Sequence, residues 1–142
     1  MRPNSQASPT PPLILVVDDD PVIRRLIADL LAEEGYEVAT AGDGGAALRW
    51  LDEQRAFGRR DPDAILLDMK MPVVDGWQFA AAYRARPGPH ARIVVLTAAA
   101  RTASWAAEIG ADGVLPKPFE LDELLAAVQS QVGNAARAPT ND

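Results

Sequence analysis

The sequence predicts an α/β protein with a doubly wound, five-stranded parallel sheet, and three observations support this fold class. Short apolar runs alternate with segments whose apolar residues recur at helical spacing. The runs are apolar at consecutive positions, as in strands that helices cover on both faces. Five such strand–helix units follow one another within 142 residues, a length that fits one domain.

The first unit consists of the apolar run at residues 13–17 and a helix that begins at Pro21. Asp20 is expected to cap this helix, because its carboxylate accepts hydrogen bonds from free backbone N–H groups and proline suits the first helical position. Gly35 is expected to end the helix. The apolar face predicted for it comprises Val22, Ile23, Leu26, Ile27, Leu30 and Leu31.

The other four units repeat this pattern. Strands are predicted at residues 36–41, 64–67, 92–96 and 113–115. Helices are predicted at residues 43–55, 77–84 and 102–109, and a last helix carries Leu121, Leu124, Leu125, Val128 and Val132 on one face. Loops are indicated by proline and glycine, above all at Pro72, Gly76 and Pro87-Gly88-Pro89.

Both ends of the chain differ in composition from the region between them. Residues 1–12 are rich in Pro, Ser, Thr and Asn and are expected to form a disordered leader, and residues 134–142 a disordered tail. The domain is therefore expected at residues 13–133. The leader lacks the apolar core of a signal peptide, and no apolar run is long enough to cross a bilayer. A cytoplasmic protein without a membrane partner is expected.

Charge and cysteine content exclude further classes. The formal net charge is -6 and basic residues such as Arg24-Arg25 and Arg59-Arg60 are scattered, which is typical of solvated surface. Direct binding to nucleic acid is not expected, because it needs clustered positive charge. The chain has no cysteine, so disulfides and thiolate metal sites are excluded.

Polar residues stand where the predicted strands end. Asp18 and Asp19 follow the first strand, Asp68 the third and Thr97 the fourth, and Lys117 lies near the end of the fifth. In a doubly wound sheet these ends converge on one small area. Three carboxylates, a hydroxyl and an ammonium group are therefore expected to share one pocket.

This set of groups suits Mg²⁺ and phosphoryl transfer. Closely packed carboxylates repel one another, and a hard divalent cation with oxygen ligands offsets that repulsion. We expect Asp19 and Asp68 to be direct ligands and Asp18 to act directly or through water. A carboxylate beside the metal can act as a nucleophile toward phosphorus. Lys117 and Thr97 would then stabilise the phosphoryl oxygens, and Ala98 would leave space beside them.

Four motifs in the chain are typical of one family. They are ILVVDDDP at 14–21, AILLDMKMPVVDGW at 64–77, IVVLTAAA at 93–100 and GADGVLPKPF at 110–119. From about Leu13 to Val132 the sequence resembles the CheY-like receiver domains of bacterial response regulators in two-component signal transduction. The resemblance implies a (βα)5 flavodoxin-like fold with strand order 2-1-3-4-5.

The resemblance also implies a role for each matching position. Asp68 would be phosphorylated by a histidine kinase or a histidine phosphotransfer protein, and Mg²⁺ would be bound by Asp18, Asp19, Asp68 and the backbone carbonyl of Lys70. The protein would catalyse only its own phosphorylation and dephosphorylation and would not otherwise be an enzyme.

Switching would depend on a second group of positions. Thr97 would move toward the phosphoryl group, Lys117 would pair with it, and the Lys117-Pro118 peptide bond would be cis. Ala98 would leave room beside the group. Val114 stands where the family usually has an aromatic switch residue, so the usual coupling is not expected here.

The implied output is a change in the surface formed by the fourth helix, the fifth strand and the last helix. A downstream protein target, or a homodimer through that surface, would recognise the change. The ten residues after the last helix leave no room for an output domain, so a single-domain regulator is expected.

Two other functions remain as alternatives. One is a receiver-like protein-binding module that is not phosphorylated, although such modules usually lose acidic or lysine positions that this chain keeps. The other is a Mg²⁺-dependent aspartyl phosphohydrolase resembling the haloacid dehalogenase family. Those enzymes have a second aspartate two residues after the nucleophile, where this chain has Lys70.

Overall fold

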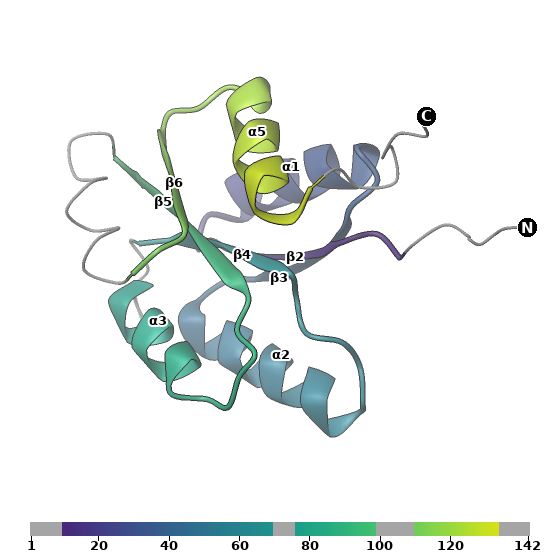
Figure 1. Cartoon of the computed structure of the whole chain (residues 1–142). Helices are drawn as coiled ribbons and strands as arrows, with labels where there is room; N and C mark the ends of the chain where they lie inside the picture. Colours follow the sequence, from purple (N-terminus) through teal and green to yellow (C-terminus); the bar gives the residue numbers. More distant parts are fainter. Residues whose placement is uncertain (1–9, 70–75, 99–109, 134–142) are drawn as a thin grey trace, which may run out of the picture.

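The computed structural model describes residues 10–69, 76–98 and 110–133 (Figure 1). Several predicted features lie outside these ranges. They are the helix at 102–109, the loop residue Pro72, the proposed ligand Lys70, and most of the leader and all of the tail.

The described residues form a five-stranded sheet in which every neighbouring pair is parallel, in the order β3-β2-β4-β5-β6. The strands are β2 (Leu13–Val17), β3 (Glu37–Ala41), β4 (Ala64–Asp68), β5 (Arg92–Ala98) and β6 (Gly113–Lys117). Counted along the chain this order is 2-1-3-4-5, so the predicted fold class and strand order are confirmed. β6 continues past its predicted end at residue 115, because Pro116 and Lys117 remain in register with Thr97 and Ala98 of β5.

Helices cover both faces of the sheet. They are α1 (Pro21–Glu33), α2 (Gly44–Ala56), α3 (Gly76–Arg84) and α5 (Leu121–Val132). In Figure 1, α1 and α5 lie on one face and α2 and α3 on the other. Among the residues that the structure describes, no helix has the length and the apolar character that crossing a membrane requires.

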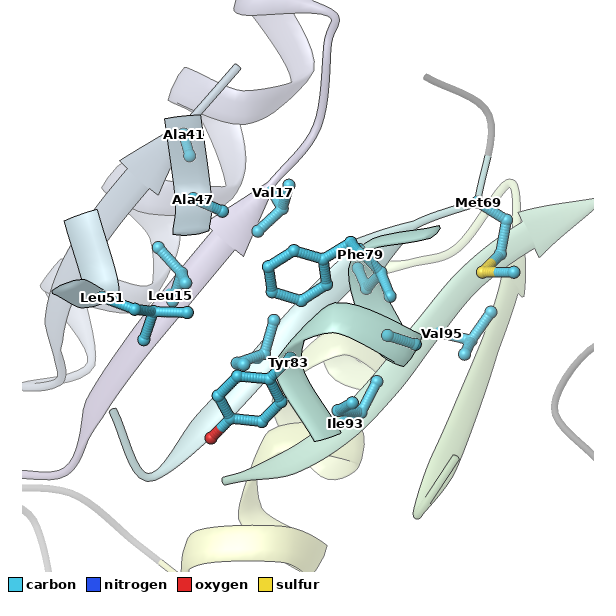
Figure 2. Close-up of a cluster of buried hydrophobic side chains, with 13 residues drawn as sticks. Leu15, Val17, Ala41, Ala47, Leu51, Met69, Phe79, Tyr83, Ile93 and Val95 are labelled. Carbon is cyan, nitrogen blue, oxygen red and sulfur yellow. The ribbon is translucent and has the colours of Figure 1, made fainter. Parts of the chain in front are cut away.

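The core has two layers, one on each face, because successive residues of a strand point in opposite directions. β2 and β4 are buried throughout, as predicted for strands covered on both sides. On one face Ile14 and Val16 pack with residues of α1 and α5. On the other, Leu15 and Val17 pack with α2 and α3; Figure 2 shows Phe79 and Tyr83 of α3 among these side chains.

The ends of α1 form as the sequence predicts. The Asp20 carboxylate accepts hydrogen bonds from the backbone N–H groups of Val22 and Ile23, at 2.9 and 3.4 Å. Gly35 follows the helix with a φ of 98°, a conformation that glycine adopts without a steric penalty.

The apolar face predicted for α1 is wider than the face that the protein buries. Ile27 and Leu31 are fully buried, whereas Val22 is 72% exposed and Leu26 is 51% exposed. Leu121, predicted on the apolar face of α5, is 42% exposed. Periodicity identifies an apolar stripe, but it does not show how much of that stripe the rest of the protein covers.

Arg60 joins several segments at the amino-terminal edge of the sheet. Its guanidinium donates to the carbonyl of Pro11 at 2.6 Å, to Glu37 at 2.9 Å and to Asp63 at 3.2 Å. Asp63 also accepts a hydrogen bond from the backbone N–H of Leu13 at 2.8 Å. Arg60 is therefore part of an exposed ion-pair network, which agrees with its interpretation as ordinary solvated surface.

Candidate functional site

The register of the two central strands brings the first acidic residues together. Val17 of β2 is the partner of Leu67 in β4. Asp18 directly follows Val17, and Asp68 directly follows Leu67. The two aspartates therefore lie side by side at the carboxyl ends of β2 and β4. Both residues are buried, Asp18 with 1% and Asp68 with 4% of its surface exposed.

The next two strands add the hydroxyl and the ammonium group in the same way. Asp68 is the partner of Leu96 in β5, which places Thr97 one position further along. Ala98, the last residue of β5, is the partner of Lys117 in β6. The parallel register alone therefore explains why these predicted site residues meet.

The three aspartates form a compact acidic cluster. One carboxylate oxygen from each of Asp18, Asp19 and Asp68 lies within 4.8 Å of the others. Asp18 Oδ1 accepts a hydrogen bond from the N–H of Asp20 at 2.9 Å. Asp18 Oδ2 is buried and has no hydrogen-bond partner among the described residues. A buried carboxylate oxygen without a donor is costly, and a hard cation would satisfy it.

Lys117 lies over this cluster. Its Nζ is 3.4 Å from Asp68 Oδ1 and 3.8 Å from Asp18 Oδ2. With every group ionised, the three clustered carboxylates and the ammonium group together carry a formal charge of -2. A divalent cation would neutralise this charge, so the residues present fit Mg²⁺.

Thr97 contributes a buried hydroxyl to the same pocket. The residue is 4% exposed, and within the described part of the chain its Oγ1 finds no hydrogen-bond partner. Thr97 lines one pocket together with the acidic cluster and Lys117. A hydroxyl held in this way is available to an anion that enters beside Lys117.

Arg24 is a site residue that the sequence interpretation missed. Its Nη1 donates to the backbone carbonyl of Asp18 at 2.8 Å, so the half-buried guanidinium holds the loop that carries the acidic residues. The same nitrogen would lie 3.1 Å from a Cβ added to Gly42, in the loop after β3. The assignment of Arg24 to solvated surface was wrong. Its position one turn into the helix, within reach of the preceding strand end, was the available signal.

An apolar groove opens from the site between α1 and α5. The cavity has a volume of about 990 Å³ and contains the polar groups of the site at one end. Its remaining walls, called the α1–α5 groove below, consist of Ile23, Leu26, Ile27, Leu30, Pro118, Phe119, Leu121 and Leu124.

The remaining predicted switch positions lie along β5 and β6. Val114, on β6, is 38% exposed. The Lys117-Pro118 peptide bond is cis, as the resemblance implied.

Comparison with known proteins identifies the family to which this fold and site belong. A family model for the response regulator receiver domain matches residues 14–129. The chain belongs to the response regulator receiver domain family. Members of this family are phosphorylated on an aspartate in two-component systems, interact with histidine kinases, and are signalling domains rather than classical enzymes. Receiver domains bind Mg²⁺ at their acidic pocket.

Curated relatives include two mycobacterial regulators. The transcriptional regulatory protein PrrA of Mycobacterium tuberculosis is 43% identical over 123 residues, which cover 85% of this chain and 50% of PrrA. The response regulator MprA of Mycobacterium leprae is 40% identical over 119 residues, covering 82% of this chain and 49% of MprA. The receiver chain thus spans about half the length of these relatives.

Solved receiver structures share the fold. Chemotaxis response regulator CheY4 of Vibrio cholerae is 32% identical with a TM-score of 0.73, and the match covers 87% of this chain and 100% of CheY4. TrrA of Thermotoga maritima, in complex with Mg²⁺-BeF, is 36% identical with a TM-score of 0.70, covering 85% of this chain and 99% of TrrA. The receiver domain of the Pseudomonas aeruginosa sensor histidine kinase PA1611 has magnesium coordinated in its active-site cleft. It is 33% identical with a TM-score of 0.74, covering 88% of this chain and 100% of that domain.

Proposed function

We propose that this receiver accepts a phosphoryl group on Asp68 from a histidine kinase or a histidine phosphotransfer protein, in a Mg²⁺-dependent reaction. The observation that supports this most strongly is the position of Asp68. Its buried carboxylate lies 3.4 Å from the Lys117 ammonium and belongs to the acidic cluster with Asp18 and Asp19.

In the proposed reaction, an Asp68 carboxylate oxygen forms a bond to phosphorus. The bond between phosphorus and the donor nitrogen of the histidine breaks, and the electron pair stays on that nitrogen. Lys117 pairs with the transferred oxygens, and the Thr97 hydroxyl donates a hydrogen bond to them. Asp18, Asp19, Asp68 and the Lys70 carbonyl would hold Mg²⁺, which supplies positive charge to the phosphoryl oxygens.

The proposed output is a change in the protein surface that includes β6 and α5. Movement of Thr97 toward the phosphoryl group would begin the change, and Pro118 and the small Ala98 would support it. Val114 is aliphatic, so the change would not depend on rotation of an aromatic ring at that position. A protein target or a second receiver would bind the altered surface.

The chain's acidity bears on where its partners bind. With a formal net charge of -6 the receiver repels phosphate backbones, so we propose that it acts through protein contacts in the cytoplasm rather than on nucleic acid directly. The relatives PrrA and MprA are named as regulators, and residues beyond their receiver half would carry any binding to DNA.

The deciding experiment is an intact-mass measurement after incubation with Mg²⁺ and acetyl phosphate. We expect a gain of one phosphoryl group, lost in Asp68→Asn and after chelation of the metal. Asp29→Asn serves as the matched control, because Asp29 is an exposed aspartate on α1 that pairs with Arg25. If the wild-type protein gains no mass although it binds Mg²⁺, the chain is a receiver-like binding module.

A further inference from the structure

We propose that Asp112 is a positioning residue for phosphoryl transfer: its hydrogen bonds to β5 set the register of β6 and thereby place Lys117 beside the acceptor Asp68. This inference rests on the proposed function of Asp68 and Lys117. Asp112 belongs to the motif GADGVLPKPF, but it takes no direct part in the site. It directly precedes β6 and so lies at the amino-terminal edge of the sheet, away from the acceptor.

Asp112 is joined to one residue of β5 by two hydrogen bonds of opposite direction. Its backbone N–H donates to the carbonyl of Ile93 at 2.8 Å, and its carboxylate Oδ2 accepts from the N–H of Ile93 at 2.8 Å. A hydrogen bond to a carboxylate is stronger than one between neutral groups. The next residues along the two strands, Val94 and Gly113, are the first partners in the β5–β6 ladder. The Asp112–Ile93 pair therefore fixes the point at which this ladder begins.

β6 has few other interactions that fix its register. It is the last strand of the described sheet and pairs with β5 alone. Within β6 only Leu115 is buried. Gly113 has no side chain to pack, and Pro116 has no backbone N–H to donate. A strand with one neighbour and one buried side chain specifies its register weakly, so the pair that precedes it has a large influence.

The same arrangement precedes β4. The backbone N–H of Asp63 donates to the carbonyl of Leu13 at 2.7 Å, and the Asp63 carboxylate accepts from the N–H of Leu13 at 2.8 Å. The residues that follow, Ile14 and Ala64, are the first partners in the β2–β4 ladder. β4, however, is buried throughout and pairs with both β2 and β5, so its register has other support. Of the two aspartates, Asp112 is therefore the one on which a strand register depends.

The register of β6 determines where the ammonium group of Lys117 lies. Lys117 is the last residue of β6 and the partner of Ala98 in β5. Its Nζ is 3.4 Å from Asp68 Oδ1 and 3.8 Å from Asp18 Oδ2. A shift of β6 by one residue would move Lys117 by about 3.3 Å and turn its side chain to the other face of the sheet. A displacement of only about 1 Å can reduce a reaction rate about a hundredfold.

The first test compares Asp112→Ala with Asp112→Asn, using acetyl phosphate with Mg²⁺ and following intact mass over time. We expect Asp112→Ala to react about tenfold more slowly than the wild-type protein, because Lys117 is displaced but still present. Asparagine keeps an acceptor oxygen for the N–H of Ile93, so Asp112→Asn is expected to react within about twofold of the wild-type rate. A wild-type rate in Asp112→Ala overturns the inference, and so does an asparagine variant as slow as the alanine variant.

A second variant covers the case in which Asp112→Ala does not fold. Asp112→Glu keeps the carboxylate but lengthens the side chain by one methylene, so the bond to Ile93 can form only with β6 displaced. It is therefore expected to react more slowly than Asp112→Asn, although it keeps the native charge. A glutamate variant that reacts faster than the asparagine variant overturns the inference.

A double-mutant cycle tests whether Asp112 acts through Lys117. In the Lys117→Gln background, Asp112→Ala is expected to change the phosphorylation rate by less than about twofold, because the group that Asp112 positions is already absent. Asp63→Ala is the matched control. It removes the equivalent pair before β4, and its effect on the rate is expected to be the same with and without Lys117. If the losses from Asp112→Ala and Lys117→Gln multiply, Asp112 has only a structural role and the inference fails.

Mg²⁺ binding separates this inference from the proposed function. Moving the ammonium group away leaves the negative charge of the acidic cluster less balanced, so Asp112→Ala is expected to bind Mg²⁺ more tightly than the wild-type protein by calorimetry. General damage to the pocket would weaken binding instead and would overturn the inference. If acetyl phosphate fails to modify wild-type Asp68, the proposed function fails, and the Mg²⁺ affinity still tests the position of Lys117. If the wild-type protein is phosphorylated and Asp112→Ala matches it in rate and affinity, only this inference fails.

Discussion

The guanidinium of Arg24 and the backbone carbonyl of Asp18 are joined by a hydrogen bond of 2.8 Å. This bond connects the first turns of α1 to the end of β2, where the acidic residues begin. Arg24 therefore holds the loop that carries Asp18 and Asp19, the proposed Mg²⁺ ligands, without itself being one of the proposed ligands.

Loss of this bond should weaken metal binding. We predict that Arg24→Ala lowers the Mg²⁺ affinity about tenfold, a typical effect for a residue that orients metal ligands. Calorimetric titration with Mg²⁺ measures this directly. Arg25→Ala is the control, because the neighbouring arginine has a side chain 81% exposed and pairs only with Asp29 among the described residues. Equal affinities in the two variants would refute the positioning role.

Gly42 should act through the same guanidinium. A Cβ at this position would lie 3.1 Å from Arg24 Nη1 and would displace it. Gly42→Ala is therefore predicted to lower the Mg²⁺ affinity several-fold in the wild-type background and to have little further effect in Arg24→Ala. Calorimetric titration of the variant that carries both Gly42→Ala and Arg24→Ala with Mg²⁺ completes the double-mutant cycle. Additive losses would mean that Gly42 acts independently of Arg24.

Lys117 should have opposite effects on metal binding and on phosphorylation. Lys117→Gln removes the ammonium group 3.4 Å from Asp68, and the formal charge of the cluster changes from -2 to -3. We predict tighter Mg²⁺ binding but phosphorylation about a hundredfold slower, because the transferred oxygens lose their charged partner. Titration and intact mass measure the two effects. A variant that loses Mg²⁺ binding would contradict the electrostatic argument.

Gly76 is expected to tolerate no side chain. A Cβ there would lie 2.5 Å from Met69 Sδ and 2.9 Å from Met69 Cα, next to the acceptor. We predict that Gly76→Ala lowers the free energy of unfolding by about 1–3 kcal/mol, as overpacking does elsewhere. Urea denaturation provides the measurement. Gly88→Ala, whose Cβ would meet no atom closer than 3.8 Å, should change stability much less.

Alkaline pH should destabilise the fold through Tyr36. Burial, and to a lesser degree the charge of Glu34, raises the pKa of Tyr36 above 10.0. The folded state therefore favours the protonated phenol, which donates to the carbonyl of Gly133 at 3.0 Å. This contribution to stability is complete below about pH 10 and is lost as the pH rises through the folded-state pKa.

Urea denaturation from pH 8 to pH 11 measures this effect. Tyr36→Phe should flatten the loss of stability above pH 10, because phenylalanine has no proton to lose. Burial also raises the pKa of Tyr83, so some dependence should remain in Tyr36→Phe and disappear in the variant that also carries Tyr83→Phe. A pH profile unchanged in both variants would contradict the assignment.

The sheet and the meeting of the site residues were predictable from the sequence. Apolar runs predicted buried parallel strands. Because the carboxyl ends of parallel strands lie at one edge of the sheet, the residue after each run was predicted to lie at that edge. The sequence alone was enough to place Asp18 and Asp68 together, because each aspartate directly follows the apolar run of its strand.

What the sequence did not show depends on side-chain direction and coverage. Leu26 has the spacing of a core residue, but 51% of its surface is exposed, and it lines the α1–α5 groove. Arg24 stands beside Arg25 in the sequence, and only the fold directs one toward a backbone carbonyl and the other toward solvent. Periodicity describes a helix surface, whereas these outcomes depend on what packs against it.

The network around Arg60 lies at the amino-terminal edge of the sheet, away from the acceptor. There, Arg60 is paired with both Glu37 and Asp63, so this network keeps a formal charge of only -1. At the other edge, the acidic cluster keeps an excess of negative charge. The domain can therefore be tethered or labelled at its amino-terminal edge with little disturbance of the field at Asp68, which makes that edge suitable for a fluorophore that reports on signalling.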